Sequence, residues 1–249
     1  PVPIPMPKNS STPVLFLTAR SAIVLDLPSK TVIFAKQPDL PLLPASTTKI
    51  MTALVALDYY QPQDILTIFD QWEEGQVVGF KKGERMTFTN LLYGLLVGSG
   101  NDAAWVLAAN YPGGGQEFIK KMNDKGKQLN LEHTHFVNPT GIDVWNQKTT
   151  VHDLAILTAE TLKNPLFKKT VAIPKTTISD LAGNNYTLEN TNKLLAQDSR
   201  VLGVKTGWTE TAGECLVSYV EKDDRQLVTV VLASQDRFGE TTKLINWAL

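Results

Sequence analysis

Short apolar runs that are separated by polar turns mark the two ends of the chain as strands. Two runs rich in β-branched residues are separated by Leu-Pro-Ser-Lys, which is typical of a turn, and they predict an N-terminal hairpin. Near the other end, similar runs lead into a second predicted hairpin, which turns at two consecutive aspartates. The predicted strands cover residues 21–26, 31–36, 200–205, 214–220 and 226–233.

The middle of the chain has a helical period instead. From residue 46 to about residue 166, apolar residues recur at spacings of three and four, as at Ile50, Ala53, Leu54 and Leu57. One such helix is predicted from Thr150 to a stop before Pro165, and a last helix runs from about Gly239 to the end. The three glycines at 113–115 predict a flexible loop.

This order of strands, helices and strands predicts an α+β fold. The economical packing joins both strand groups into one antiparallel sheet flanked by helices, and the helical segment at about 45–170 forms a mostly helical second lobe. We expect residues 13–249 to form this domain and the proline-rich residues 1–12 to be a linker. A functional cleft is expected between the two lobes.

Composition excludes several classes of protein. The 249 residues are 43% hydrophobic and 20% charged, with a net charge of -1 and no basic stripe for nucleic acid. The single cysteine, Cys215, precludes an intramolecular disulfide and a zinc cluster, and its strand-like surroundings predict a buried hydrophobic role.

Neither a metal nor another cofactor is expected. His133 and His135 could contribute to a metal site, but the sequence offers no third ligand beside them. No apolar run is long enough to span a membrane. The proline-rich residues at the start are typical of a spacer, so we expect a secretion signal or membrane anchor on the other side of it, outside this chain.

The first candidate chemical motif is Ser46-Thr-Thr-Lys49, which follows Pro44-Ala45. Side chains three residues apart on a helix lie on one face, with Cβ atoms about 5–6 Å apart. A serine hydroxyl needs a nearby base to become a good nucleophile, and a neutral lysine amine can supply that base. Alone, the pattern also fits a helix-capping serine followed by a solvated lysine.

Two further motifs follow in chain order. Ser99-Gly-Asn101 lies between two apolar runs and predicts a tight corner between helices, from which a hydroxyl and an amide can face a cleft. Lys205-Thr206-Gly207 ends a predicted strand, where glycine permits close approach of a ligand and lysine adds positive potential. Each motif alone fits an ordinary turn or strand end. Together, in this order, they indicate a catalytic site.

The set of motifs resembles that of the serine penicillin-recognising enzymes, which carry S-x-x-K, S-x-N and K-T-G. Longer phrases make the chain similar to the low-molecular-mass penicillin-binding proteins, the serine-type D-alanyl-D-alanine carboxypeptidases of peptidase family S11. The phrases that carry this resemblance are residues 44–54, 98–104, 136–141, 190–195 and 203–207. The resemblance implies the β-lactamase/DD-peptidase fold and a location outside the cytoplasm.

The resemblance also implies roles for individual residues. The expected substrate is a peptidoglycan stem peptide ending in D-Ala-D-Ala, and β-lactam antibiotics are expected to acylate the same serine. The implied catalytic residues are the nucleophile Ser46, its base Lys49 and the proton-relaying Ser99. The implied substrate-binding residues are Asn101, Lys205, Thr206, Gly207, Trp208, Thr209 and Arg237.

One site residue departs from the family pattern, and another matches it only loosely. Trp208 follows the K-T-G motif where many relatives have His or Tyr, and Arg237 matches a carboxylate-binding arginine only by its distance from the closing helix. A β-lactamase or a DD-endopeptidase remains an alternative, since both share the nucleophile. Residues 160–164 only approximate the E-x-x-L-N loop of class A β-lactamases. A non-catalytic wall-binding module is the third interpretation.

Overall fold

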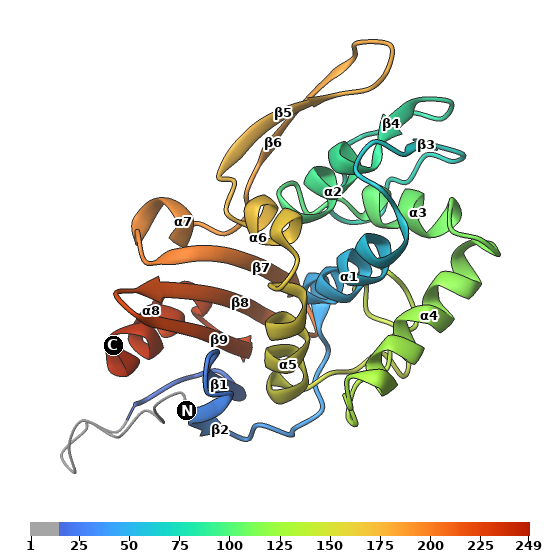
Figure 1. Ribbon diagram of the computed structural model, residues 1–249. Coiled ribbons are helices and arrows are strands. Elements are labelled where there is room, and N and C mark those ends of the chain that lie inside the picture. Colours follow the sequence, from blue (N-terminus) through green and yellow to red (C-terminus); the bar gives the residue numbers. More distant parts are fainter. Residues whose placement is uncertain (1–14) are drawn as a thin grey trace.

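The computed structural model describes residues 15–249, and the predicted linker at residues 1–12 lies outside them. One five-stranded antiparallel sheet, in the order β2-β1-β9-β8-β7, forms the centre of the first lobe (Figure 1). Its strands are β1 (Ser21–Asp26), β2 (Thr31–Lys36), β7 (Val201–Thr209), β8 (Gly213–Lys222) and β9 (Arg225–Ser234). Both predicted hairpins are therefore present, and the two ends of the chain share one sheet.

Helices cover both faces of this sheet. On β1, Ile23 and Leu25 join the core shared with the helical lobe, whereas Val24 joins a second core beneath the C-terminal helix α8 (Arg237–Ala248). This division follows from the alternation of side chains along a strand. Because both faces are covered, β1 is buried along its whole length.

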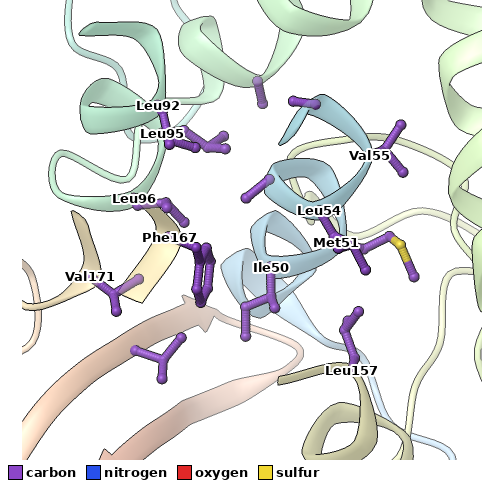
Figure 2. Close-up of a cluster of buried hydrophobic side chains, with 14 of the residues drawn as sticks. Ile50, Met51, Leu54, Val55, Leu92, Leu95, Leu96, Leu157, Phe167 and Val171 are labelled. Carbon is purple, nitrogen blue, oxygen red and sulfur yellow. The ribbon is translucent and has the colours of Figure 1, made fainter. Parts of the chain in front are cut away.

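The second lobe is mostly helical and is built around α1 (Lys49–Tyr59). The other helices and short strands of this part of the chain are η1 (Ala45–Thr48), β3 (Ile65–Thr67), β4 (Arg85–Thr87), α2 (Phe88–Leu96), α3 (Asn101–Ala109), α4 (Gly114–Gln128), α5 (Val151–Thr161) and α6 (Pro165–Val171). Figure 2 shows Ile50, Met51, Leu54 and Val55 of α1 surrounded by side chains from α2, α5 and α6. Residues 49–56 of α1 are all buried, so this helix is a core element on every side.

After α6 the chain forms a projecting hairpin, β5 (Lys175–Ser179) with β6 (Asn185–Glu189), and the short helix α7 (Leu194–Gln197) (Figure 1). The hairpin is fixed to the helical lobe, because Asn90 Nδ2 of α2 donates to the Ser179 carbonyl oxygen at 2.8 Å. The observed architecture is the predicted α+β class. Neither of the two small antiparallel sheets, β3–β4 and β5–β6, was predicted.

Two local predictions can be compared with the structure. Residues 113–115 were expected to be a flexible loop, but α4 begins at Gly114, with Gly113 at its N-cap in a left-handed conformation. The buried Phe118 and Met122 hold the first turns of α4 against the lobe. Cys215 is fully buried on β8, as predicted, and burial raises the pKa of its thiol to about 11. No helix formed by residues 15–249 combines the length and apolar character needed to cross a bilayer.

Candidate active site

Ser46 and Lys49 meet at the start of α1, as the S-x-x-K spacing predicts. Ser46 belongs to η1, and Lys49 is the first residue of α1. Lys49 Nζ lies 2.8 Å from Ser46 Oγ. Lys49 is fully buried, whereas an ordinary lysine keeps its amine in water. The alternative of a solvated lysine is therefore excluded.

Two further oxygens surround the Lys49 amine. Asn101 Oδ1 lies 2.7 Å from Lys49 Nζ, and the Thr140 carbonyl oxygen lies 2.8 Å from it. Asn101 Nδ2 donates to the Glu74 carbonyl oxygen at 2.9 Å, so the oxygen end of this amide must face the lysine. The amine thus has three oxygen partners, one of which is the nucleophile.

Electrostatics favour the neutral form of Lys49. Burial, and after it the charge of Lys205, lowers the pKa of Lys49 well below its usual value, while Asp102 acts in the opposite direction. A neutral amine has two N–H groups and one lone pair. Asn101 Oδ1 and the Thr140 carbonyl can only accept, so they take the two N–H groups. The lone pair is then left for the Ser46 hydroxyl, which is the arrangement that general-base activation requires.

The S-G-N motif forms the predicted corner between α2 and α3. Ser99 is nearly buried and has a φ of 57°, and Asn101 begins α3. The next residue, Asp102, fixes the loop that precedes β4: its carboxylate accepts hydrogen bonds from the backbone N–H groups of Val78, Gly79 and Phe80. This buried carboxylate was not predicted from the sequence.

The K-T-G motif lies on β7, directly beside the nucleophile. A Cβ placed on Gly207 would lie 2.9 Å from the backbone nitrogen of Ser46, so only glycine lets the strand approach this closely. Lys205 is buried, and its Nζ donates to the Thr206 carbonyl oxygen at 3.0 Å. Burial, and after it the charge of Arg237, lowers the pKa of Lys205 to about 7.

The remaining predicted residues lie on β7 or at the start of α8. Arg237 Nη1 donates to the Gly207 carbonyl oxygen at 2.8 Å, which places this guanidinium beside the K-T-G strand. Thr206 Oγ1 lies 2.5 Å from Thr191 Oγ1, and Thr209 Oγ1 donates to Asp143 Oδ2 at 2.7 Å.

Trp208 is the most exposed of the predicted site residues. Its side chain is 62% exposed. Side chains alternate across a strand, so Trp208 lies on the face of β7 opposite to the one that Gly207 turns toward Ser46.

Direct contacts therefore join Ser46, Lys49 and Asn101, and close packing adds Gly207. No metal site accompanies them: among residues 15–249, no three His, Cys, Asp or Glu side chains are placed to hold an ion. The sequence did not single out the Thr140 carbonyl. A backbone oxygen has no residue-type signal, although the phrase Asn138-Pro-Thr-Gly141 was part of the resemblance.

The chain is similar to known proteins over most of its length. A family model described as D-alanyl-D-alanine carboxypeptidase, peptidase S11, matches residues 7–236. The chain is 32% identical over 241 residues to the D-alanyl-D-alanine carboxypeptidase DacF of Bacillus subtilis, covering 92% of this chain and 62% of DacF. It is 34% identical over 241 residues to the D-alanyl-D-alanine endopeptidase of Escherichia coli, covering 93% of this chain and 77% of that protein.

A solved structure with the same fold is a Streptomyces DD-transpeptidase. Its crystal structure superimposes with a TM-score of 0.89 at 30% identity and covers 94% of this chain and 98% of that one. The chain thus spans less than two thirds of DacF but nearly the whole of this transpeptidase.

Proposed function

The chain belongs to the peptidase S11 family of D-alanyl-D-alanine carboxypeptidases, and from that premise we propose that it removes the terminal D-alanine of peptidoglycan stem peptides. The reaction proceeds through an acyl-enzyme on Ser46. The observation that carries this proposal is the buried Lys49 amine, 2.8 Å from Ser46 Oγ, with two acceptor oxygens orienting its remaining hydrogens.

In the first step, Ser46 Oγ attacks the carbonyl carbon between the two D-alanines while its proton passes to the Lys49 amine. The negative charge on the former carbonyl oxygen is stabilised by the backbone N–H groups of Ser46 and Trp208. The close packing of Gly207 against the Ser46 nitrogen supports this pairing, because it brings β7 alongside η1.

In the second half of this step, the C–N bond breaks and the departing D-alanine takes up a proton. Ser99 and Lys205 form the relay, since Lys205, with a pKa of about 7, can both accept and release a proton near neutral pH. Water then attacks the ester carbonyl, and Ser46 regains its proton when the shortened peptide leaves.

Substrate binding is assigned to β7 and the corner before α3. Asn101 orients the peptide backbone. Thr206 and Arg237 hold the terminal carboxylate, and the hydrogen bond from Arg237 to the Gly207 carbonyl oxygen supports this position of the guanidinium. Thr209 joins them when its hydroxyl rotates away from Asp143 Oδ2. β-Lactams present a similar carbonyl and carboxylate and acylate the same serine. Because peptidoglycan lies outside the cytoplasm, we place the protein there.

The test begins with a labelled penicillin and intact-mass analysis. We expect one adduct per chain on the peptide that contains Ser46 and none in Ser46→Ala. Release of D-alanine from diacetyl-Lys-D-Ala-D-Ala then separates a carboxypeptidase from a β-lactamase, which would instead turn over the penicillin. No adduct in the unchanged chain would refute the proposal.

Endopeptidase activity is the second candidate, because the chain is 34% identical to the E. coli endopeptidase and 32% identical to DacF. Its substrate would be a cross-linked muropeptide dimer. Cleavage of the dimer without release of D-alanine from the tripeptide would replace the carboxypeptidase assignment.

A further inference from the structure

The turn at residues 138–142 reaches the Lys49 amine through the Thr140 carbonyl oxygen, and two side chains hold that turn in place. Asn138 and Gln147 are both buried, at 7% and 3% exposure. They lie nine residues apart, one on each side of an irregular segment, and Gln147 Nε2 donates to Asn138 Oδ1 at 3.4 Å. We refer to them as the Asn138–Gln147 pair.

Asn138 binds the backbone on both sides of the Thr140 carbonyl. Its Oδ1 accepts from the N–H groups of Thr140 at 3.1 Å and Gly141 at 2.7 Å, and from Thr140 Oγ1 at 2.8 Å. Its Nδ2 donates to the Ile142 carbonyl oxygen at 2.9 Å. The peptide group that carries the Thr140 oxygen is the one that ends in the Gly141 N–H, so Asn138 holds this peptide directly.

Gln147 completes the arrangement from the other side. Its Oε1 accepts from the backbone N–H groups of Val137 at 2.9 Å and Asn138 at 3.1 Å, and its Nε2 also donates to the Ile142 carbonyl oxygen at 3.2 Å. Both side-chain amides therefore donate hydrogen bonds to this turn and accept hydrogen bonds from it. A carboxylate could only accept, and an aliphatic side chain could do neither.

Neighbouring contacts fix the turn against the nucleophile segment. The carbonyl oxygen of Pro139 accepts from Thr52 Oγ1 at 2.6 Å, one turn along α1 from Lys49. A Cβ on Gly141 would lie 1.8 Å from the carbonyl oxygen of Ala45, so this residue packs directly on the chain that leads into Ser46. A small movement of the turn would therefore shift Ser46 and Lys49 as well.

We propose that Asn138 and Gln147 are positioning residues, which aim the Thr140 carbonyl at Lys49 and thereby direct the lone pair of the neutral amine at the Ser46 hydroxyl. The inference rests on the proposed function, since it assigns the pair a part in the activation of Ser46. Without the Thr140 acceptor, one N–H of Lys49 would compete for Ser46 Oγ. The amine would then be donating to the nucleophile instead of accepting its proton.

The experiment measures acylation by a chromogenic cephalosporin under rapid mixing. It separates the limiting acylation rate constant at saturation from the dissociation constant of the complex that precedes acylation. Asn138→Ala is expected to lower the limiting rate constant by about 10- to 100-fold, the size of effect that a small misplacement of a catalytic group produces. The dissociation constant should remain unchanged, because neither member of the pair is assigned a contact with the ligand.

A matched control binds the same segment from α4. Asn123 of α4 also holds a backbone group through both ends of its amide: Oδ1 accepts from the Phe136 N–H at 2.9 Å, and Nδ2 donates to the Phe136 carbonyl oxygen at 2.8 Å. Asn123→Ala removes a similar clamp without touching the peptide that carries the Thr140 oxygen. It is expected to lower the melting temperature while leaving the limiting rate constant near that of the unchanged chain.

A milder variant covers the case in which Asn138→Ala does not fold. Thr140→Val keeps the carbonyl but removes the hydroxyl that links Asn138 Oδ1 to the Ile142 N–H. It should lower the limiting rate constant by a smaller factor, again with the dissociation constant unchanged.

Equal losses in Asn138→Ala and Asn123→Ala, or no loss in a folded Asn138→Ala, would overturn the assignment while leaving the proposed function intact. Failure of the unchanged chain to become acylated at Ser46 would instead refute the proposed function itself. Saturation kinetics on the unchanged chain therefore come first.

Discussion

Replacing Lys205 by methionine should make the protein more stable while removing its activity. Lys205 is 1% exposed on β7, and among residues 15–249 its amine has one hydrogen-bond acceptor, the neutral Thr206 carbonyl oxygen at 3.0 Å from Nζ. Burial, and after it the charge of Arg237, lowers the pKa of Lys205 to about 7. Methionine has a similar length and volume and no charge, so it fills the same space without desolvating an amine.

The size of the effect follows from the difference in pKa between the folded and unfolded chains. A lysine with a pKa of 10.5 when unfolded and about 7 when folded destabilises the charged folded state by about 5 kcal/mol, at ~1.36 kcal/mol per pKa unit. The whole penalty applies below about pH 7, where both states hold the proton. Between about pH 7 and 10.5 the unfolded chain binds more protons, so stability rises with pH and the penalty disappears.

Lys205→Met should therefore raise the free energy of unfolding at pH 7 by about 2–4 kcal/mol, after about 1 kcal/mol is deducted for the lost hydrogen bond. For a chain of this size, that gain corresponds to an increase in Tm of about 5–15 °C. Acylation by penicillin should fall by about 100-fold or more, because the proposed proton relay and the positive charge beside the substrate carboxylate are both lost.

The assay is thermal unfolding followed by circular dichroism at a series of pH values from 6 to 10. The difference in Tm between the variant and the unchanged chain should be largest at the acid end and should shrink as the pH rises. Lys193→Met, at an exposed lysine, is the control and should give no such gain. A Tm for Lys205→Met at or below that of the unchanged chain at pH 7, or a difference that does not vary with pH, would refute the reasoning.

Four further substitutions test other parts of the site. Gly141→Ala should destabilise the fold by about 3 kcal/mol or more, measured by denaturant unfolding, because φ is +92° and the new Cβ would lie 1.8 Å from the Ala45 carbonyl oxygen. Asp102→Asn should cost about 3 kcal/mol in the same assay, since one amide oxygen cannot replace two carboxylate oxygens that accept backbone N–H groups. Lys49→Arg should lower the rate of penicillin acylation by about 100-fold or more, because a guanidinium does not give up its proton at accessible pH. Trp208→Ala should change the unfolding free energy by no more than about 0.5 kcal/mol, as expected for a 62% exposed side chain. It should also reduce acylation by well under 100-fold, since the proposed oxyanion donor is the backbone N–H, and a larger loss would assign the side chain a direct part.

The sequence predicted those parts of the fold and site that are encoded locally. The strands of the sheet carry runs of β-branched residues, and the pair Ser46 and Lys49 depends only on a one-turn spacing, so both could be recognised without knowledge of the packing. The corner at 99–101 was recognisable because apolar helices flank three turn-forming residues.

The parts that escaped prediction depend on contacts between distant residues or on weak patterns. In the β5–β6 hairpin, Tyr186 and Leu188 do alternate with exposed polar residues along β6, but this pattern covers only five residues, and Ile178 is the one apolar side chain of β5. In α4, the glycines that open the helix hid the amphipathic pattern of Phe118 and Met122. The Asn138–Gln147 pair acts across nine residues through side-chain amides, for which hydrophobic periodicity has no signal.

The burial of α1 determines which protonation state Lys49 adopts. A lysine at the start of a helix on the protein surface would stay protonated at neutral pH and could not accept a proton from serine. Here residues 49–56 of α1 are all buried, and this burial in the helical lobe removes water from the first turn. The same burial would be too costly for an unpartnered amine, so the oxygens of Asn101 and Thr140 must be supplied by two other segments. Burial in the hydrophobic core thus lowers the pKa of Lys49. The contacts with Asn101 and Thr140 orient the amine so that its lone pair faces Ser46.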